Sequence, residues 1–209
     1  MSRILNKTRR NSVFTLFIGL GVYLALININ LDTYTGLCIE SFHSNRINRS
    51  YAKFGIDVNG KRKIVKVKLS NDDLPLEGSR VIISKRIIGH GLERELSNPV
   101  DSPLYLLTGE INMYLLGIQV PIDNDVYLEV YQNGRRTNYQ LEGRNYFVEL
   151  HSDKDASLVF SCEGYKTKRV HLPKANLSFY HVFRANCVFE EGEGTTERTM
   201  NLDSLLKSS

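Results

Sequence analysis

The chain has 209 residues, a formal net charge of +4 and three cysteines. At about 100–150 residues per domain, this length leaves room for one or two small domains beside a membrane segment. Hydrophobic residues make up 42% of the chain, which excludes a wholly disordered protein. Frequent Tyr, Phe and Val, with no Trp, favour strands over helices after the first segment.

The first feature along the chain is a basic N-terminus, 1–12, followed by the uncharged run VFTLFIGLGVYLALINI at 13–29. This length lies at the short end of the roughly 17–25 residues that span a bilayer. A cleaved signal peptide and a buried core helix are the alternatives. The run is longer than a usual signal h-region, and no small-x-small cleavage site follows it. We therefore expect 13–29 to be a retained transmembrane signal anchor.

The flanking charges predict the orientation of this anchor. Four basic residues precede it, whereas the first one after it is Arg46, and the near flank carries Asp32 and Glu40. The positive-inside rule then keeps 1–12 cytoplasmic and places the rest of the chain outside, in a periplasmic or extracellular space. We expect a single-pass protein of the cell envelope, with the lipid bilayer as one partner.

The segment 31–99 predicts a small antiparallel β-domain. Apolar and polar residues alternate over 51–58, Asn59-Gly60 follows, and alternation resumes over 64–69. Asn-Gly is the strongest short hairpin signal, because both residues tolerate the positive φ of a type I′ turn. A turn-rich loop then leads to a third strand, RVIIS.

Basic residues are concentrated on the return strand of this hairpin. Lysines that alternate along an exposed strand are most often a solvated face that resists aggregation. The functional alternative is contact with anionic lipid headgroups, at about 1 kcal/mol per basic residue. Nucleic acid is not an expected partner, since no nucleic-acid-binding motif accompanies the charges. The candidate binding residues are Lys61, Arg62, Lys63, Lys66 and Lys68.

The segment 104–189 predicts an antiparallel β-sandwich. It opens with two apolar runs around Asn112, which are buried strands or one bent strand, and it ends with a strand-like run over 177–189. A second hairpin signal, Asn133-Gly134, lies near its start. Short strands at regular spacing with turns between them are typical of a sandwich. The intervening predicted strands are 125–131, 136–141, 146–150, 158–162 and 168–172.

Part of this segment resembles a known family. The stretch DVYLEVYQNGRRTNYQLEGRNYFVELHSDKDASLVFSCEGYKTKRVHL, at 125–172, carries L-x-V-Y-x-N-G, G-x-x-Y/F-x-V-x-L and L-x-F-S-x-E-G-Y-K-x-K-x-V in order. It is similar to the carboxypeptidase regulatory-like, or transthyretin-like, sandwich of bacterial envelope proteins. Glu142-Gly143 and Arg144-Asn145 stand where the family usually has Asp-Gly. The resemblance implies a structural or adhesive module without catalytic residues of its own.

A search for chemistry finds no constellation that predicts an enzyme, and G-x-S-x-G, H-E-x-x-H, Walker A and C-x-x-C motifs are all absent. His171 and His181 make a metal pair conceivable across two strands, but single histidines are far more often structural. We expect no metal and no cofactor. In an oxidising compartment Cys162 and Cys187 could form a disulfide, and two buried free thiols are the alternative.

Four tyrosines leave two interpretations open. Tyr139, Tyr146, Tyr165 and Tyr180 are numerous enough to build a polar-aromatic binding face. The alternative, which we favour, is that their rings cover the sandwich core with the hydroxyl in water.

The segment 190–209 changes in character. EEGEGTTER is acidic and rich in Gly and Thr, which predicts a disordered tail. Leu202, Leu205 and Leu206 could form one amphipathic turn for docking, although so short a helix is marginal alone.

Together these features predict a mainly β protein with one N-terminal transmembrane helix, a small antiparallel β-domain and a C-terminal β-sandwich. We expect a non-catalytic, membrane-anchored envelope protein that binds another protein or a surface polymer through its extracytoplasmic domains. The alternative is an accessory subunit of a larger membrane complex, docked through the small face that Gly19, Gly21 and Ala25 give the transmembrane helix.

Overall fold

The protein is mainly β. The computed structural model describes residues 30–44, 49–69, 74–87, 89–97, 104–115, 118–122, 124–175, 177 and 179–203. The predicted anchor, 13–29, lies outside the described residues. Within the described part of the chain, no helix combines the length and apolar character needed to cross a bilayer.

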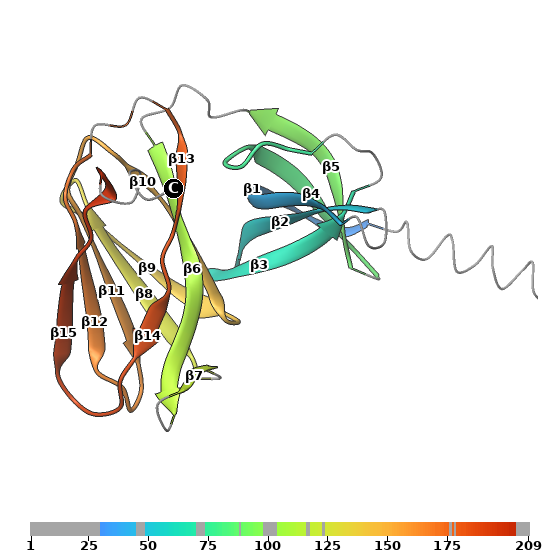
Figure 1. Cartoon of the computed structure of the whole chain (residues 1–209). Helices are drawn as coiled ribbons and strands as arrows, with labels where there is room; N and C mark the ends of the chain where they lie inside the picture. The colour runs from blue at the N-terminus through green and yellow to red at the C-terminus, as the bar shows by residue number, and fades with distance from the viewer. Residues whose placement is uncertain are drawn as a thin grey trace, which may run out of the picture.

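Five antiparallel strands build an N-terminal block (Figure 1): β1 (Asn30–Ser44), β2 (Arg49–Val58), β3 (Lys61–Lys68), β4 (Arg80–Arg86) and β5 (His90–Ser97). The predicted hairpin is confirmed, because Asn59 and Gly60 join β2 to β3 with φ values of 53° and 78°. Side chains alternate as expected, and Ala52, Phe54 and Ile56 lie in the core of this block.

The C-terminal block is a two-layer sandwich. One layer contains β8 (Val126–Gln132), β9 (Arg135–Glu142), β11 (Ala156–Cys162), β12 (Thr167–Leu172) and β15 (Thr195–Thr199). The other contains β6 (Leu104–Leu115), β7 (Ile118–Pro121), β10 (Asn145–His151), β13 (His181–Arg184) and β14 (Cys187–Phe189). The largest apolar core of the described residues fills the space between the two layers.

The structure decides between the two expectations for the apolar runs around Asn112. One strand continues through this residue, because Asn112 lies inside β6 and pairs with Val188 of β14. The long run at 177–189 is divided into β13 and β14, which both pair in parallel with β6. The break falls at Ala185 and Asn186, where the Asn186 side chain accepts a hydrogen bond from the backbone N–H of Glu110 at 3.0 Å.

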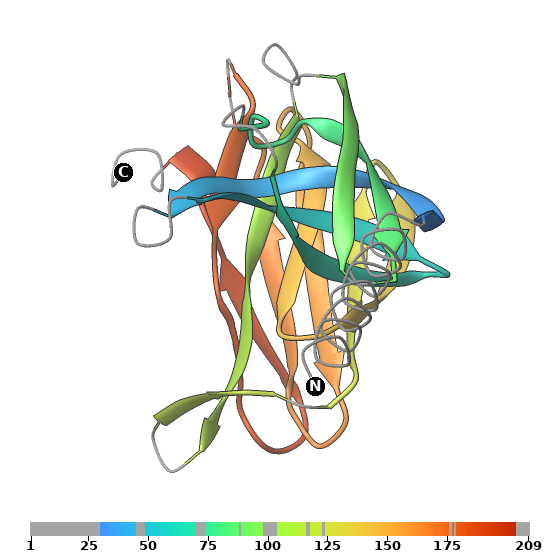
Figure 2. The same ribbon diagram turned by 90° about the vertical axis from the view of Figure 1, so that its right-hand side faces the viewer.

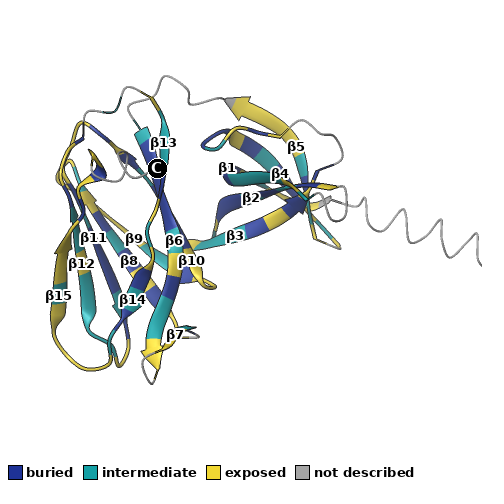
Figure 3. Cartoon of the chain, in the orientation of Figure 1, coloured by how far each residue is buried: buried dark blue, intermediate teal, exposed yellow. Residues whose placement is uncertain are grey.

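The two blocks share one sheet, which the sequence did not predict. β3 pairs in parallel with β9 through three consecutive residues, Lys61–Lys63, and this pairing joins the blocks into a sheet of order β15-β12-β11-β8-β9-β3-β2-β1-β4-β5. The strands at the two ends of this sheet, β15 and β5, are largely exposed (Figure 3). Figure 2 shows β1 crossing β6 at a steep angle, so the two blocks diverge away from the β3–β9 pairing.

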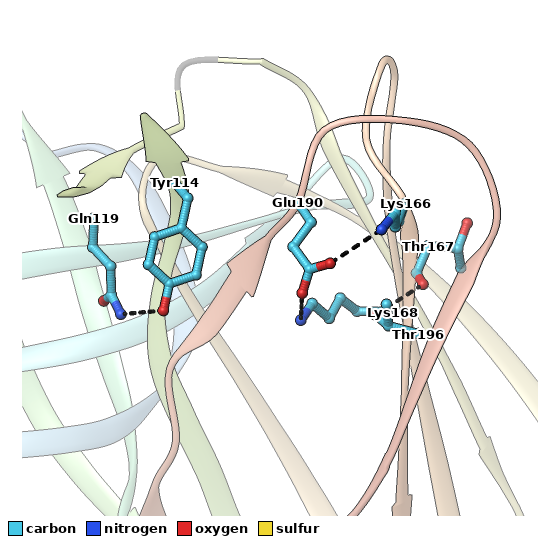
Figure 4. A network of polar contacts seen from close by, with 7 residues as sticks. All are labelled: Tyr114, Gln119, Lys166, Thr167, Lys168, Glu190 and Thr196. Carbon is cyan, nitrogen blue, oxygen red and sulfur yellow. Dashed lines mark hydrogen bonds and ion pairs between the residues drawn. The ribbon is translucent and has the colours of Figure 1, made fainter. Parts of the chain in front are cut away.

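The acidic segment after residue 190 is folded as far as the structure describes it, to residue 203, and the expectation of disorder is wrong for this part. β15 pairs in parallel with β12, and Met200 and Leu202 are buried in the sandwich core. Glu190 lies between the ammonium groups of Lys166, at 3.2 Å, and Lys168, at 3.7 Å (Figure 4). Strand pairing and two buried side chains outweigh the polar, glycine-rich composition.

The ion pairs of Glu190 predict a pH effect on stability. Lys166 and Lys168 lower the pKa of the Glu190 carboxyl in the folded protein. A lowered pKa stabilises the fold above the pKa of the unfolded chain, and this contribution disappears as the pH falls through the folded-state pKa. Glu190→Gln should therefore lower the melting temperature slightly at neutral pH and not in strong acid. Thermal melts at both pH values check this, with Glu191→Gln as the control, and an equal loss at both would contradict it.

Candidate functional site

The two blocks meet at a joint in which aromatic rings of the C-terminal block pack on glycines of the N-terminal block. The ring of Phe147 covers Gly55 so closely that a Cβ there would lie 2.6 Å from a ring carbon. Tyr180 covers Gly78 in the same way, and a Cβ on Gly78 would lie 2.2 Å from the tyrosine ring. A side chain at Gly55 or Gly78 would therefore clash, and the close packing resists sliding of one block on the other.

Arg62 links the two blocks at this joint. Its side chain is only 16% exposed, and its Nη1 donates a hydrogen bond of 2.9 Å to the backbone oxygen of Phe147. The guanidinium carbon lies 3.4 Å from the ring centroid of Tyr139 and 4.9 Å from that of Phe147. Burial lowers the pKa of Arg62, although Tyr139 and Asp57 oppose this. Arg62 therefore holds the blocks together and is not part of an exposed binding face.

Ion pairs at the surface surround the joint. Glu77 of the N-terminal block pairs with the Arg184 guanidinium at 3.1 Å. Arg80 contacts Glu149, which also accepts a hydrogen bond of 3.3 Å from the Tyr180 hydroxyl. Each exposed pair contributes little stability alone, but together they fix the relative orientation of the blocks.

Beside the joint, where the blocks diverge, an open cleft of about 710 Å³ lies between them. The N-terminal wall comes from β1, β2 and β3, and the opposite wall comes from β6, the start of β10 and the break between β13 and β14. The residues that line it are Ile39, Glu40, Lys53, Ile64, Lys66, Thr108, Gly109, Glu110, Asn145, Arg184 and Asn186.

The lack of a side chain at Gly109 lets β6 lie close to the break between β13 and β14 at the floor of the cleft. A Cβ at this position would lie 1.9 Å from the backbone oxygen of Ala185, at the break between β13 and β14. Next to it, Thr108 Oγ1 donates a hydrogen bond of 2.7 Å to the backbone oxygen of Tyr146.

The N-terminal wall continues outward as an aromatic shelf, formed by Phe42, Tyr51, Lys53 and Lys66. The rings of Phe42 and Tyr51 stack with centroids 5.8 Å apart. The ammonium of Lys66 lies 4.2 Å from the Tyr51 centroid and 5.1 Å from that of Phe42. Lys53 pairs with Glu40 at 2.7 Å, whereas no described carboxylate lies within ion-pair distance of Lys66. The charge of Lys66 is therefore available to a ligand.

The five predicted basic residues of β3 do not form one face. Because side chains alternate along a strand, Lys61 and Lys63 share the side of the buried valines of β3, and Arg62, Lys66 and Lys68 lie on the other. Lys63 pairs with a carboxylate of β9 at 3.5 Å, and Arg62 is within the joint. Only Lys66 lines the cleft, while Lys68 is exposed at the end of the strand.

The candidate tyrosines and histidines are in contact with, or belong to, the folded strands of the sandwich and the joint. Tyr146 donates a hydrogen bond of 2.6 Å to the backbone oxygen of Ala185, and Tyr165 contacts the sulfur of Met113. With Tyr139 and Tyr180 in the joint, the four tyrosines are buried or half-buried against other parts of the protein and do not come together on one face. His171 and His181 lie in different layers of the sandwich, on β12 and β13.

Cys162 and Cys187 are free and buried in the same core, as is Cys38 in the other block. Burial raises the pKa of Cys187 to about 12, and burial together with nearby Glu77 raises the pKa of Cys38 to about 12. Burial also raises the pKa of Cys162. Thiolate is the reactive form, so these thiols are protected.

These thiol environments predict slow chemical modification of the folded protein. With a chromogenic disulfide reagent at mildly alkaline pH, we expect little reaction before unfolding and three equivalents of thiol after it. Two fewer equivalents in the unfolded, unreduced protein, restored by a reductant, would instead show a disulfide, and peptide mapping would show whether it joins Cys162 to Cys187.

Sequence reasoning identified Lys66 but missed most of the cleft. The sequence near the shelf does indicate which side chains face outward, because Tyr51 and Lys53 alternate with buried residues of β2. No local pattern indicates the opposite wall, since Thr108, Glu110 and Asn186 come together only through the parallel pairing of β6 with β13 and β14. No family model matches the chain, and no curated protein matches it significantly.

Proposed function

We propose that this chain is a non-catalytic, membrane-tethered envelope protein that holds an extended, acidic segment of a partner protein in the cleft between its blocks. The observation that carries the proposal is the unpaired ammonium of Lys66, placed on an aromatic shelf at the edge of the cleft. A carboxylate of a ligand would meet a cation there whose position two aromatic rings already restrict.

The composition of the two walls favours a polypeptide over a uniformly charged polymer. Both walls carry both signs of charge: Lys53, Lys66 and Glu40 lie on one, and Glu110, Arg184 and the amides of Asn145 and Asn186 lie on the other. A uniform polyanion would meet repulsion from Glu110. A peptide offers both amide donors and acceptors and side chains of either charge, so it can match both walls.

The rigid joint supports binding as the role of the cleft. Since Phe147, Tyr180 and Arg62 fix the two blocks, the walls are held apart before a ligand arrives. A preformed site loses little conformational entropy of its own on binding. This offsets part of the entropy that a flexible segment loses when it is ordered in the cleft.

Three further parts of the proposal rest on the sequence. The tether is the apolar segment 13–29 with the positive-inside orientation. We assign 104–189 to the carboxypeptidase regulatory-like family on the resemblance of 125–172, and the two-layer β arrangement supports this assignment. Docking of the transmembrane helix into a larger membrane complex stays the alternative.

The test uses a set of short fluorescent peptides of graded acidity, with polygalacturonate as the polymer probe. We expect a peptide that intersperses glutamate with neutral residues to bind more tightly than its glutamine counterpart and than polyglutamate, and Lys66→Glu to weaken its binding about tenfold, or about 1.4 kcal/mol. Lys174→Glu, at an exposed site outside the cleft, is the matched control. Fluorescence anisotropy measures the affinities.

Two outcomes overturn this proposal. If polygalacturonate binds with Lys66 dependence and no peptide does, the occupant is a surface polymer. If Lys66→Glu and Lys174→Glu have equal effects, peptides bind elsewhere on the protein by general electrostatics.

A further inference from the structure

The fold begins without a linker after the apolar segment. The last residue of the run 13–29 is followed directly by Asn30, the first residue of β1. If 13–29 spans the bilayer, as the proposed function holds, the start of β1 lies at the membrane surface, because one extended residue adds only about 3.3 Å. The surface of the fold around Asn30 must then face the lipid headgroups.

Two exposed apolar side chains lie at this end of the N-terminal block. β1 and β4 pair so that Asn30 is opposite Arg86, and Leu31 and Ile87 each directly follow one member of this pair in the chain. Both are exposed, and Ile87 is 46% exposed. Apolar side chains at a site next to a bilayer can enter the interface, whereas water surrounds them in a free domain.

Lysines lie at the same end of the N-terminal block as these apolar side chains. The turn of the β2–β3 hairpin lies at the same end as the start of β1 (Figure 2), and Lys61 follows this turn directly. Lys85 lies opposite Asp32 in the strand register, and Lys63 and Lys85 are both near enough to His90 to help burial lower its pKa. Within the described residues, no carboxylate reaches ion-pair distance of Lys61 or Lys85.

We infer that Leu31, Lys61, Lys85 and Ile87 form a membrane-facing rim, which rests on the headgroups of an anionic bilayer. This inference depends on the tether of the proposed function and adds the orientation of the protein. The rim orients β1 away from the bilayer. Phe42, at the shelf, is then up to about 40 Å from the membrane, so the cleft opens away from the lipid.

The test measures the depth of single labelled positions in vesicle-bound full-length chain. Ile87→Cys and the control Leu96→Cys carry an environment-sensitive fluorophore, and the buried native thiols leave the new cysteine as the reactive one. Ile87 and Leu96 have the same exposure, 46%, but Leu96 lies near the far end of β5. Vesicles contain phosphatidylcholine and phosphatidylglycerol with a lipid-borne quencher.

We expect the fluorophore at position 87 to be quenched at least threefold more than that at 96. Lys61→Glu with Lys85→Glu should reduce this difference in vesicles that contain phosphatidylglycerol. Equal quenching at 87 and 96 in a chain that floats with the vesicles would overturn the rim and leave the tether intact. A chain that does not float with the vesicles would overturn the tether itself, and the rim with it.

Discussion

Replacing Phe147 with alanine is expected to lower the free energy of unfolding by about 3–5 kcal/mol. The ring is buried in the small cluster between the blocks, where it packs on Gly55 and contacts the Arg62 guanidinium. Its removal leaves a cavity at the joint and takes one aromatic partner from a charged group already removed from water. Urea denaturation followed by circular dichroism measures the change.

Phe179→Ala is the matched control for Phe147→Ala. The Phe179 side chain is 59% exposed, so its loss should change the free energy of unfolding by less than about 0.5 kcal/mol. The joint also positions the cleft, and we expect Phe147→Ala to weaken peptide binding even under conditions where the variant is folded. Equal stability of the two variants would contradict the packing described for the joint.

Leu202→Ala is expected to cost about 2–4 kcal/mol of stability, although the residue lies in a segment whose composition predicts disorder. Leu202 is fully enclosed by the sandwich core, just after β15 pairs with β12. Its truncation leaves a cavity under the last described strand. Urea denaturation again gives the magnitude.

Leu96→Ala provides the comparison for Leu202→Ala, because the same chemical change is made at an exposed position of β5. We expect this control to be nearly neutral. If Leu202→Ala were equally neutral, the segment beyond residue 190 would not be part of the folded core.

Local signals in the sequence predicted the local structure well. Both Asn-Gly turns form two-residue hairpins with positive φ at Asn59 and Asn133, because turn type depends on the turn residues themselves. The alternation of apolar residues likewise identified the buried faces of β2 and β8. The same period of two, applied to β3, would also have separated Lys61 and Lys63 from Lys66.

Pairing between distant segments explains what the sequence did not predict. The parallel contact of β3 with β9 joins residues far apart in the chain, and neither strand carries a mark that identifies its partner. β15 was missed because Gly and Thr around acidic residues resemble a disordered tail, and only its contact with β12 orders it. The opposite wall of the cleft depends on such a pairing, that of β6 with β13 and β14, so it could not be read from composition or spacing.

The cleft between the two rigidly joined blocks is the proposed binding site. Hydrogen–deuterium exchange of the full chain, with and without a saturating glutamate-rich peptide, tests this assignment most directly. We expect slower exchange at 64–66 of β3 and 108–110 of β6, with no change at the exposed face of β8 around Tyr127 and Tyr131. Protection at β8 or at the edge strand β15, with none at 64–66 and 108–110, would contradict it.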